Sequence, residues 1–268
     1  MSETLDLDAY LARIGWHGPR APTVGVLDGV LAAHMAAIPF ENLDVLLGRP
    51  IRLDLPGLQA KLVGARRGGY CFEHATLLGA ALEALGFEVG RHSARVTLYV
   101  PRERAARTHM FLTVVLDGRR VVLDPGFGAL APRRPVPLDG EPATLGRERH
   151  AIVRDGPWWV LRASAGESPV DAWSSTLEAD GPVDFEMGNH YTSTHRSSGF
   201  VNGLMLRALT PDGRVAVRDR ELTVWRDGTA ERRRLGSRSE LRALLAAHFG
   251  FDLPEVETLR VPSIPDWN

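Results

Sequence analysis

The sequence lacks several features that would assign a protein to a class at once. Its 268 residues include one cysteine and a single lysine, Lys61, and the formal net charge is −1. One cysteine forms neither an intramolecular disulfide nor a cysteine-based zinc site, which excludes a disulfide-stabilised secreted scaffold and gives no reason to expect a metal. The near-zero charge gives no global signal for nucleic acid or a membrane surface. We interpret the rarity of lysine as codon composition.

Long apolar runs are absent as well. No window approaches the 18 consecutive apolar residues of a membrane-spanning helix. The first 16 residues are acidic and amphipathic, without the basic start and apolar centre of a signal peptide. We therefore expect a cytoplasmic protein with no membrane or nucleic-acid partner, whose oligomeric state the sequence leaves open.

The first 88 residues have the apolar spacing of helices. Thr23 and Pro39 are placed to begin and end the second of these, and Gly15 and Gly86 to end the first and the last. The four predicted helices cover residues 5–16, 23–38, 53–65 and 71–86. This part of the chain is therefore predicted to form a helical bundle.

The pattern then changes to short alternating segments typical of strands. These cover residues 90–100, 109–127, 150–164 and 201–228, and Asp-Gly dipeptides at 117–118, 155–156, 212–213 and 227–228 favour hairpin turns. Residues 131–150 are expected to be an exposed connection, and residues 237–251 a capped helix. The order of helices, strands and a mixed end predicts an α+β fold with a central antiparallel sheet or barrel.

The single cysteine, Cys71, lies at the start of the fourth predicted helix. Gly68 and Gly69 precede it and allow a tight turn. The free N–H groups and the positive dipole end of the first helical turn favour a thiolate there, which is a nucleophile at neutral pH. The position is typical of a reactive thiol, although a lone cysteine can also be a small buried apolar residue.

A nucleophilic thiol needs a base, and the base needs an orienting carboxylate. His109 begins a strand that turns at 117–118 and returns to Asp124. Residues whose numbers sum to about 235 are opposite each other in such a hairpin, so His109 and Asp124 are expected to be neighbours. A polar pair at a sheet edge is the alternative. His74, three residues after Cys71, has no carboxylate evidently placed behind it.

Four segments together resemble the arylamine N-acetyltransferases. They are IPFENLDVLLGRPI (38–51), RRGGYCFEHATLL (66–78), THMFLTVVLDGRRVVLDPGFG (108–128) and NHYTSTHRSSGFVNGLM (189–205). The resemblance implies an α+β fold of three parts: an N-terminal helical bundle (1–88), a central antiparallel β-barrel (89–199) and a C-terminal α/β lid (200–268). Ala75 stands where family members often have asparagine, so a polar role of that side chain is absent here.

The resemblance also implies an acetyl-CoA-dependent reaction without a metal. Cys71, His109 and Asp124 would form the catalytic triad, and an acetyl-cysteine would pass its acetyl group to an arylamine, arylhydrazine or N-hydroxyarylamine. We hypothesise that a buried ion pair between Arg67 and Glu41 supports the turn that contains Gly68 and Gly69, directly before Cys71, which we call the nucleophile turn.

Further residues are candidate contacts of the two substrates. For the aromatic acceptor they are Phe40, Tyr70, Val96, Leu98 and Phe127. For CoA they are Gly126, Phe127, Gly128, Asn202 and Gly203.

Other functions share this chemistry. A papain-like protease or a transglutaminase uses a similar triad, and an amide synthase that closes a polyketide-type chain falls within the same resemblance. A redox-sensing or binding protein with one reactive thiol is the non-catalytic alternative.

Overall fold

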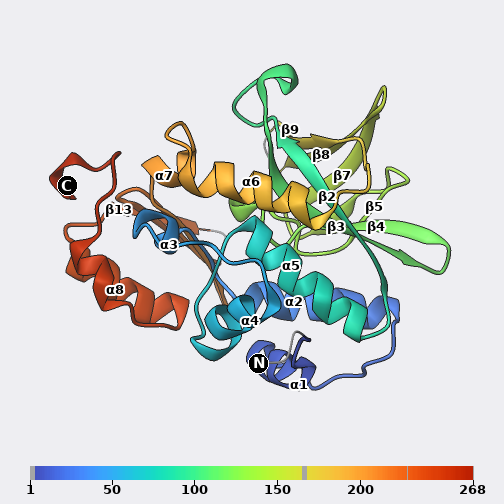
Figure 1. The fold of residues 1–268 in the computed structure, drawn as a ribbon, viewed down its shortest axis with the longest axis horizontal. Coiled ribbons are helices and arrows are strands. Elements are labelled where there is room, and N and C mark those ends of the chain that lie inside the picture. The colour runs from blue at the N-terminus through green and yellow to red at the C-terminus, as the bar shows by residue number, and fades with distance from the viewer. Residues whose placement is uncertain (1–3, 165–167, 228, 268) are drawn as a thin grey trace.

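The N-terminal part of the protein is helical. The computed structural model describes residues 4–164, 168–227 and 229–267. Five helices occupy its first 84 residues (Figure 1): α1 (Leu7–Ile14), α2 (Val24–Ala37), α3 (Leu43–Leu46), α4 (Leu55–Leu58), which continues as a π-helical turn over Gln59–Gly64, and α5 (Cys71–Ala84). The four predicted helices are thereby confirmed, and α3 was not predicted.

The ends of these helices follow from local chemistry. Thr23 accepts a hydrogen bond from the N–H of Val26 and caps α2, whereas Gly15 ends α1 in the left-handed conformation, at φ 69°. Gly86 follows α5 with φ 88°. Gly15, Thr23 and Gly86 thus mark the helix ends that the sequence predicts.

The second layer is an eight-stranded antiparallel sheet in the order β5-β4-β3-β2-β9-β8-β7-β6. Contacts between β5 and β7 nearly close it into the predicted barrel. The Asp-Gly turn at 117–118 joins β3 to β4 as predicted, and the turn that joins β7 to β8 lies one residue later than predicted, at 156–157. The strands are β2 (Glu88–Val96), β3 (Arg107–Leu116), β4 (Arg119–Leu123), β5 (Val136–Pro137), β6 (Ala143–Leu145), β7 (Glu148–Asp155), β8 (Trp158–Ser164) and β9 (Val170–Ser175).

Two expectations for this region were incomplete. Residues 131–150 are not simply an exposed connection, because they contain β5, β6 and the start of β7, and Ala131 and Val136 are buried. A helix that was not predicted, α6 (Pro182–Thr194), follows the last barrel strand and packs on β3. The short helix α7 (Gly199–Asn202) leads from it to the C-terminal part.

The C-terminal part is a five-stranded antiparallel sheet covered by a helix. Four strands are consecutive: β10 (Met205–Thr210), β11 (Gly213–Arg218), β12 (Glu221–Arg226) and β13 (Thr229–Arg234). The fifth, β1 (Phe40–Glu41), comes from the helical region and pairs with β10. The hairpin predicted at 212–213 is present, with its two-residue turn one residue earlier, at 211–212, whereas Gly228 of the turn at 227–228 lies outside the described residues. The boundaries at 88 and 199 stay predictions.

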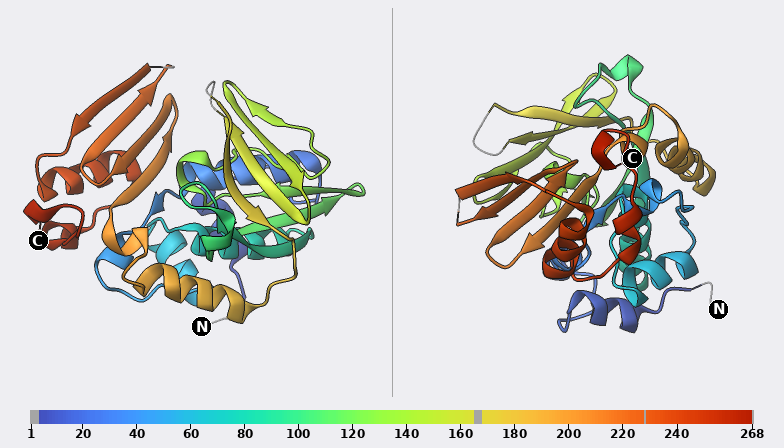
Figure 2. Two further views of the ribbon diagram at one scale, coloured as in Figure 1. Left: turned by 90° about the horizontal axis from the view of Figure 1, so that it is seen from above. Right: turned by 90° about the vertical axis from the view of Figure 1, so that its left-hand side faces the viewer.

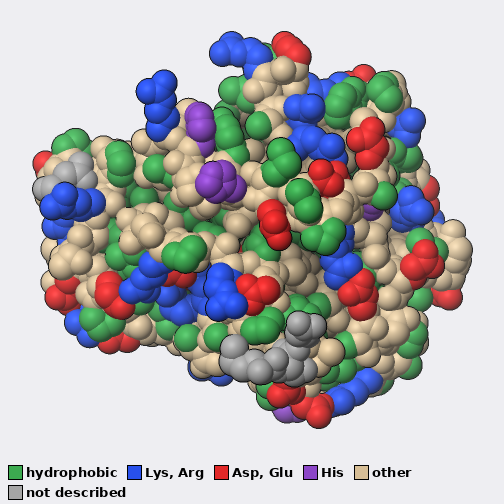
Figure 3. Space-filling model, viewed as in Figure 1, with side chains coloured by type: hydrophobic (Ala, Val, Ile, Leu, Met, Phe, Trp, Pro, Cys, Tyr) green, Lys and Arg blue, Asp and Glu red, His purple; other side chains and the backbone are tan. Residues whose placement is uncertain are grey.

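The predicted helix after this sheet is present as α8 (Arg238–Leu244), capped by Ser237, with a π-helical end over Leu245–Phe249. Figure 2 shows the C-terminal sheet and the β7–β9 part of the barrel as two blades that face each other above the helices. Three apolar cores result, one for each layer. Acidic and basic side chains are interspersed over the face in Figure 3. Within the described ranges, no helix has the length and apolarity to span a bilayer.

Candidate active site

The thiol of Cys71 lies at the first residue of α5, where the nucleophile turn meets the helix. The side chain is buried, with 3% of the residue exposed, and its Sγ lies 3.8 Å from the carbonyl oxygen of Thr108. Gly68 makes the turn possible, because a Cβ there would overlap the carbonyl oxygen of Pro39. First-turn N–H groups and the helix dipole favour negative charge at this position.

His109 and Asp124 come from one hairpin of the barrel. The pairing of Leu112 with Leu123 has the register that the Asp-Gly turn predicts. His109 Nε2 lies 2.9 Å from Asp124 Oδ2, and both residues are buried. Cys71 also acts to raise the pKa of His109, and because Nε2 is occupied by Asp124, Nδ1 is the ring nitrogen left for the thiol.

The carboxylate of Asp124 accepts hydrogen bonds from two groups besides the imidazole. Trp173 Nε1 donates to the same Oδ2 at 2.8 Å, and the N–H of Gly126 donates to Oδ1 at 3.3 Å. Burial disfavours a charged imidazole, but the adjacent Asp124 carboxylate, with help from Cys71, outweighs burial and raises the pKa of His109 to about 10. The predicted base is therefore held in a fixed orientation and stabilised as an imidazolium.

The turn after Asp124 covers the nucleophile. Gly126 packs directly on Cys71, because a Cβ there would collide with the Cα of Cys71 and lie 3.0 Å from its Cβ. The ring of Phe127 stands edge-to-face on His109 at 4.9 Å between centroids. Gly128 has φ 61°, a conformation that favours glycine. Gly126 and Phe127, two of the predicted CoA contacts, thus lie directly against the triad, and Gly128 follows them in the turn; contact of the three residues with CoA stays a prediction.

The residues predicted to contact the aromatic acceptor have different surroundings. Phe40 is half-buried and lies 6.2 Å from the ring of Phe200. Tyr70 is fully buried, and its hydroxyl donates to the side-chain oxygen of Asn189 on α6, so it exposes no surface in this conformation. Val96, at the end of β2, and Leu98, just after it, are half-buried.

The two predicted contacts in the C-terminal part serve the local chain. The side-chain nitrogen of Asn202 donates to the carbonyls of Arg196 and Ser198, at 2.7 and 2.8 Å. The carbonyl of Gly203 accepts from Asn42 at 2.8 Å. Any contact of these two residues with CoA stays a prediction.

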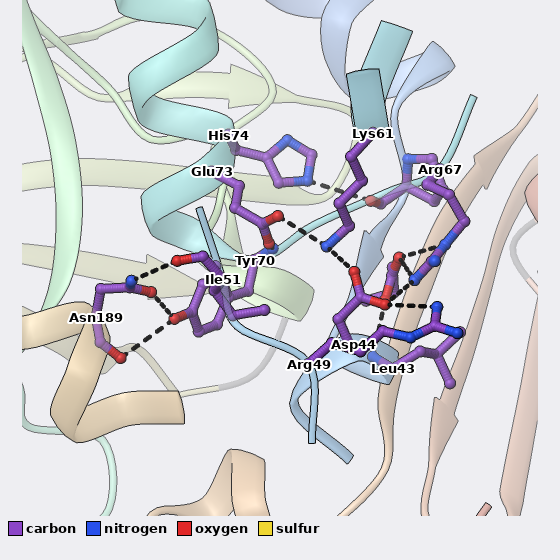
Figure 4. A network of polar contacts seen from close by, with 12 residues as sticks. Leu43, Asp44, Arg49, Ile51, Lys61, Arg67, Tyr70, Glu73, His74 and Asn189 are labelled. Carbon is purple, nitrogen blue, oxygen red and sulfur yellow. Dashed lines mark hydrogen bonds and ion pairs between the residues drawn. The ribbon is translucent and has the colours of Figure 1, made fainter. Parts of the chain in front are cut away.

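A chain of buried charges supports the nucleophile turn (Figure 4). Arg67 Nη2 lies 2.6 Å from Glu41 Oε1 and 3.2 Å from Asp44 Oδ1. Lys61 Nζ bridges Asp44 and Glu73 at 2.8 and 2.7 Å. The other carboxylate oxygen of Glu73 accepts from the N–H at position 70, directly before the nucleophile, at 3.1 Å. The Arg67–Glu41 pair of our hypothesis is thus one end of a longer network.

Sequence reasoning missed several members of this site. Glu73 is the third residue of α5, where a carboxylate caps the helix start, so its position was a usable signal. No sequence signal pointed to Trp173, because β9 reaches Asp124 only through the folding of the barrel.

His34 and His74 form a buried chain of hydrogen bonds. Tyr10 donates to His34, His34 to His74, and His74 to the carbonyl of Pro39, each at 2.9–3.2 Å.

Burial lowers the pKa of both histidines of this chain, that of His74 to about 4, so both are neutral at physiological pH.

A cavity of about 290 Å³ elsewhere, beside Arg95, Arg107 and Trp158, has none of the triad in its lining. Within the residues that the structure describes, no cluster of His, Cys, Asp and Glu is arranged to hold a metal ion.

The comparisons agree with this geometry. A sequence profile of the N-acetyltransferase family matches residues 23–258. The arylamine N-acetyltransferase of Mycolicibacterium smegmatis is 40% identical over 259 residues, covering 94% of each chain. The arylamine N-acetyltransferase / N-hydroxyarylamine O-acetyltransferase of Salmonella typhimurium is 34% identical, covering 94% of this chain and 90% of its own.

Among solved structures, Mycobacterium marinum arylamine N-acetyltransferase in complex with CoA superposes with a TM-score of 0.88 at 35% identity, over 94% of both chains. Profile, relatives and structure span most of the sequence, and they agree with the resemblance carried by the motifs around Cys71, His109 and Asp124. The chain belongs to the arylamine N-acetyltransferase family.

Proposed function

We propose that this protein transfers the acetyl group of acetyl-CoA to aromatic amines, hydrazines and N-hydroxyarylamines through an acetylated Cys71. The observation that carries the proposal is the convergence of Cys71, His109 and Asp124 from a helix and a hairpin, with the thiol against the carbonyl of Thr108 and Nε2 of His109 on Asp124. Family membership identifies the acyl donor and the class of acceptor.

The reaction has two half-reactions. The Cys71 sulfur attacks the thioester carbonyl, the carbon–sulfur bond to CoA breaks, and CoA leaves as a thiol after it takes a proton from the imidazolium. The acceptor nitrogen then attacks the carbonyl of the acetyl-cysteine, the bond between that carbon and the Cys71 sulfur breaks, and the proton that the nitrogen loses passes to His109, which can return it to the sulfur. One thioester replaces another in the first half-reaction, so little free energy is lost before the amine arrives.

The surrounding groups assist both steps. Asp124 fixes the ring orientation of His109 and stabilises the imidazolium that forms. The N–H of Cys71, at the first residue of α5, has no helical carbonyl within reach and is our candidate donor to the developing oxyanion. Phe127 offers apolar surface beside His109 for an aromatic ring, and Phe40 lies next to Gly128 of the same turn.

The test is incubation with acetyl-CoA followed by intact and peptide mass spectrometry. We expect one acetyl group on Cys71, release of CoA, and loss of the label when an arylamine is added. Cys71→Ala should not become labelled. A protein that is not acetylated but modifies glutamine-containing peptides would overturn the proposal in favour of a transglutaminase.

We also propose a cytoplasmic location, because a reducing compartment keeps a catalytic thiol free. Fractionation of the producing cells, followed by detection of the protein in the soluble cytoplasmic fraction, tests this location.

A further inference from the structure

Arg207 is a buried arginine that the proposed mechanism does not use. It lies on β10, directly opposite Phe40 of β1, and 6% of the residue is exposed. Its Nε and Nη2 are buried without a hydrogen-bond partner among the described residues. Buried polar groups are almost always hydrogen-bonded, and a guanidinium with two unsatisfied nitrogens is costly, so this one requires an explanation.

Glu148, the acidic group whose charge acts on Arg207, does not satisfy it. Glu148 on β7 accepts from Arg214 Nη1 through Oε1 at 2.6 Å and from Arg133 Nε through Oε2 at 3.0 Å. Both carboxylate oxygens are thus engaged by other arginines. Burial, and then the charge of Arg214, lower the pKa of Arg207 to about 10, which leaves it protonated at neutral pH. Three guanidinium groups around one carboxylate leave an excess of two positive charges.

Arg207 lies beside the turn that follows Asp124. A cavity of about 20 Å³ is lined by Arg207, Phe40, Pro125 and Gly128, together with neighbouring apolar residues and His74. Pro125 and Gly128 belong to the turn that covers the nucleophile. The volume accommodates one atom group of the size of a water molecule, so a single oxygen of a larger anion fits it. The Arg214–Glu148 ion pair joins the two blades that Figure 2 shows.

The strand register extends the basic character along one face of the C-terminal sheet. Arg207, Ala216, Thr223 and Arg232 are successive partners across β10 to β13 and share a face. Beside them Arg214 stacks on Trp225, 4.4 Å from the ring centroid. The opposite face is apolar and packs in the C-terminal core. An extended anionic ligand could therefore follow this face outward from Arg207.

We propose that Arg207, with Arg133 and Arg214 beside it, forms a subsite for a phosphate group of the acyl donor. The proposal rests on the proposed function, because it takes acetyl-CoA as the donor. An excess of two positive charges matches a phosphate or pyrophosphate better than the single charge of a carboxylate on an acceptor. The unsatisfied guanidinium destabilises the free protein and is satisfied on binding, which makes the site selective for donors that carry the phosphate.

The experiment compares Arg207→Met and Arg207→Lys with a matched control, Arg232→Met, which removes an exposed arginine from the same face. Each is assayed with acetyl-CoA, with acetyl-dephospho-CoA and with the phosphate-free donor S-acetyl-N-acetylcysteamine. For Arg207→Met we expect kcat/KM with acetyl-CoA to fall roughly 10- to 100-fold relative to the phosphate-free donor, the effect of losing a charge-assisted hydrogen bond. Arg207→Lys should lose less, and Arg232→Met should change the ratio less than threefold.

Comparison of the donors identifies which phosphate group of CoA contacts Arg207. If acetyl-dephospho-CoA abolishes the difference between wild type and Arg207→Met, the ligand is the 3′-phosphate; if the difference persists, it is the pyrophosphate. If kcat/KM of Arg207→Met falls only with 4-aminobenzoate as acceptor and not with aniline, Arg207 binds the carboxylate of the acceptor. That result would overturn the proposal.

Thermal unfolding separates binding from structure. We expect Arg207→Met to melt no lower than wild type when free, because an apolar side chain replaces an unsatisfied charge, and CoA to raise the melting temperature of wild type more than that of the variant. A lower melting temperature with equal loss for all donors would show a structural role and refute the subsite. Calorimetric titration with CoA needs no acetyl transfer, so it tests the subsite even if Cys71 were never acetylated.

Discussion

Substitution of Lys61 by methionine tests the buried charge network of Figure 4. Lys61 lies 2.7 Å from Glu73 and 2.8 Å from Asp44, and 17% of its side chain is exposed. Asp44 keeps Arg67 as a partner in the variant. Glu73 has no other positively charged partner among the described residues, and its carboxylate retains only the backbone N–H at position 70. Methionine preserves the apolar stem, so the change isolates the loss of the charge.

The expected loss is large because the remaining carboxylate is buried. Breaking a buried ion pair by removal of one partner costs about 3–5 kcal/mol in the free energy of unfolding. For a chain of this size each kcal/mol lowers the melting temperature by roughly 2–4 °C, so Lys61→Met should melt about 6–20 °C below wild type. Thermal unfolding followed by circular dichroism at pH 8 measures this difference in melting temperature.

The same variant has a predicted pH dependence. Burial raises the pKa of Glu73 and Lys61 opposes that effect, so the pKa rises further when Lys61 is removed. A carboxyl group with a raised folded-state pKa binds a proton in the folded protein before it does so in the unfolded chain. Stability then increases as pH falls toward the unfolded pKa. The difference from wild type should therefore be smaller at pH 5.5 than at pH 8.

Two controls make the result decisive. Glu73→Gln in the Lys61→Met background should recover part of the stability, because it removes the uncompensated charge. Arg52→Met breaks an exposed pair with Asp54, in which 59% and 46% of the side chains are exposed, and should cost less than about 1 kcal/mol. The reasoning is refuted if Lys61→Met melts within 2 °C of wild type at pH 8, or if its deficit is the same at both pH values.

Three further substitutions test the reaction centre. Asp124→Asn removes the charge that raises the pKa of His109, burial then favours the neutral ring, and the single-turnover rate of CoA release should fall on the order of 10³- to 10⁴-fold. Gly126→Ala places a methyl group against Cys71 and should slow acetylation at least about 10²-fold, with the displaced turn visible in a crystal structure; an active variant would show that the turn yields. Trp173→Phe removes one donor to Asp124 and should lower kcat roughly tenfold while KM for acetyl-CoA stays the same; an unchanged kcat would contradict the role of that hydrogen bond.

The triad could be predicted because each part depends on short-range information. The Asp-Gly turn fixes the register of the hairpin, and the observed pairing of Leu112 with Leu123 brings His109 and Asp124 together as the numbering implied. The glycines before Cys71 and the apolar period after it located the nucleophile. The sequence around each part therefore contained the geometry of that part, although not the distance between helix and hairpin.

Other parts could not be predicted because their signal is non-local. In α6 the inward-facing positions are Phe185, Gly188, Asn189 and Thr192, at helical spacing, but only the first is a large apolar residue, so the apolar period is hidden. The pairing of β1 with β10 joins segments more than 160 residues apart, and the support of Asp124 by Trp173 depends on the closure of the barrel.

The distance between α5 and the β3–β4 hairpin is set by glycines, which have no Cβ. Gly126 allows the turn after Asp124 to rest on the backbone of Cys71, and any Cβ there would force the two apart. Gly188 plays the same part on α6, where a Cβ would lie 2.9 Å from the ring of Phe72, the residue after the nucleophile. A triad assembled from two elements needs these contacts as much as it needs its reactive groups, because the thiol of Cys71 comes to the hairpin of His109 and Asp124 only where Gly126 lets the two elements touch.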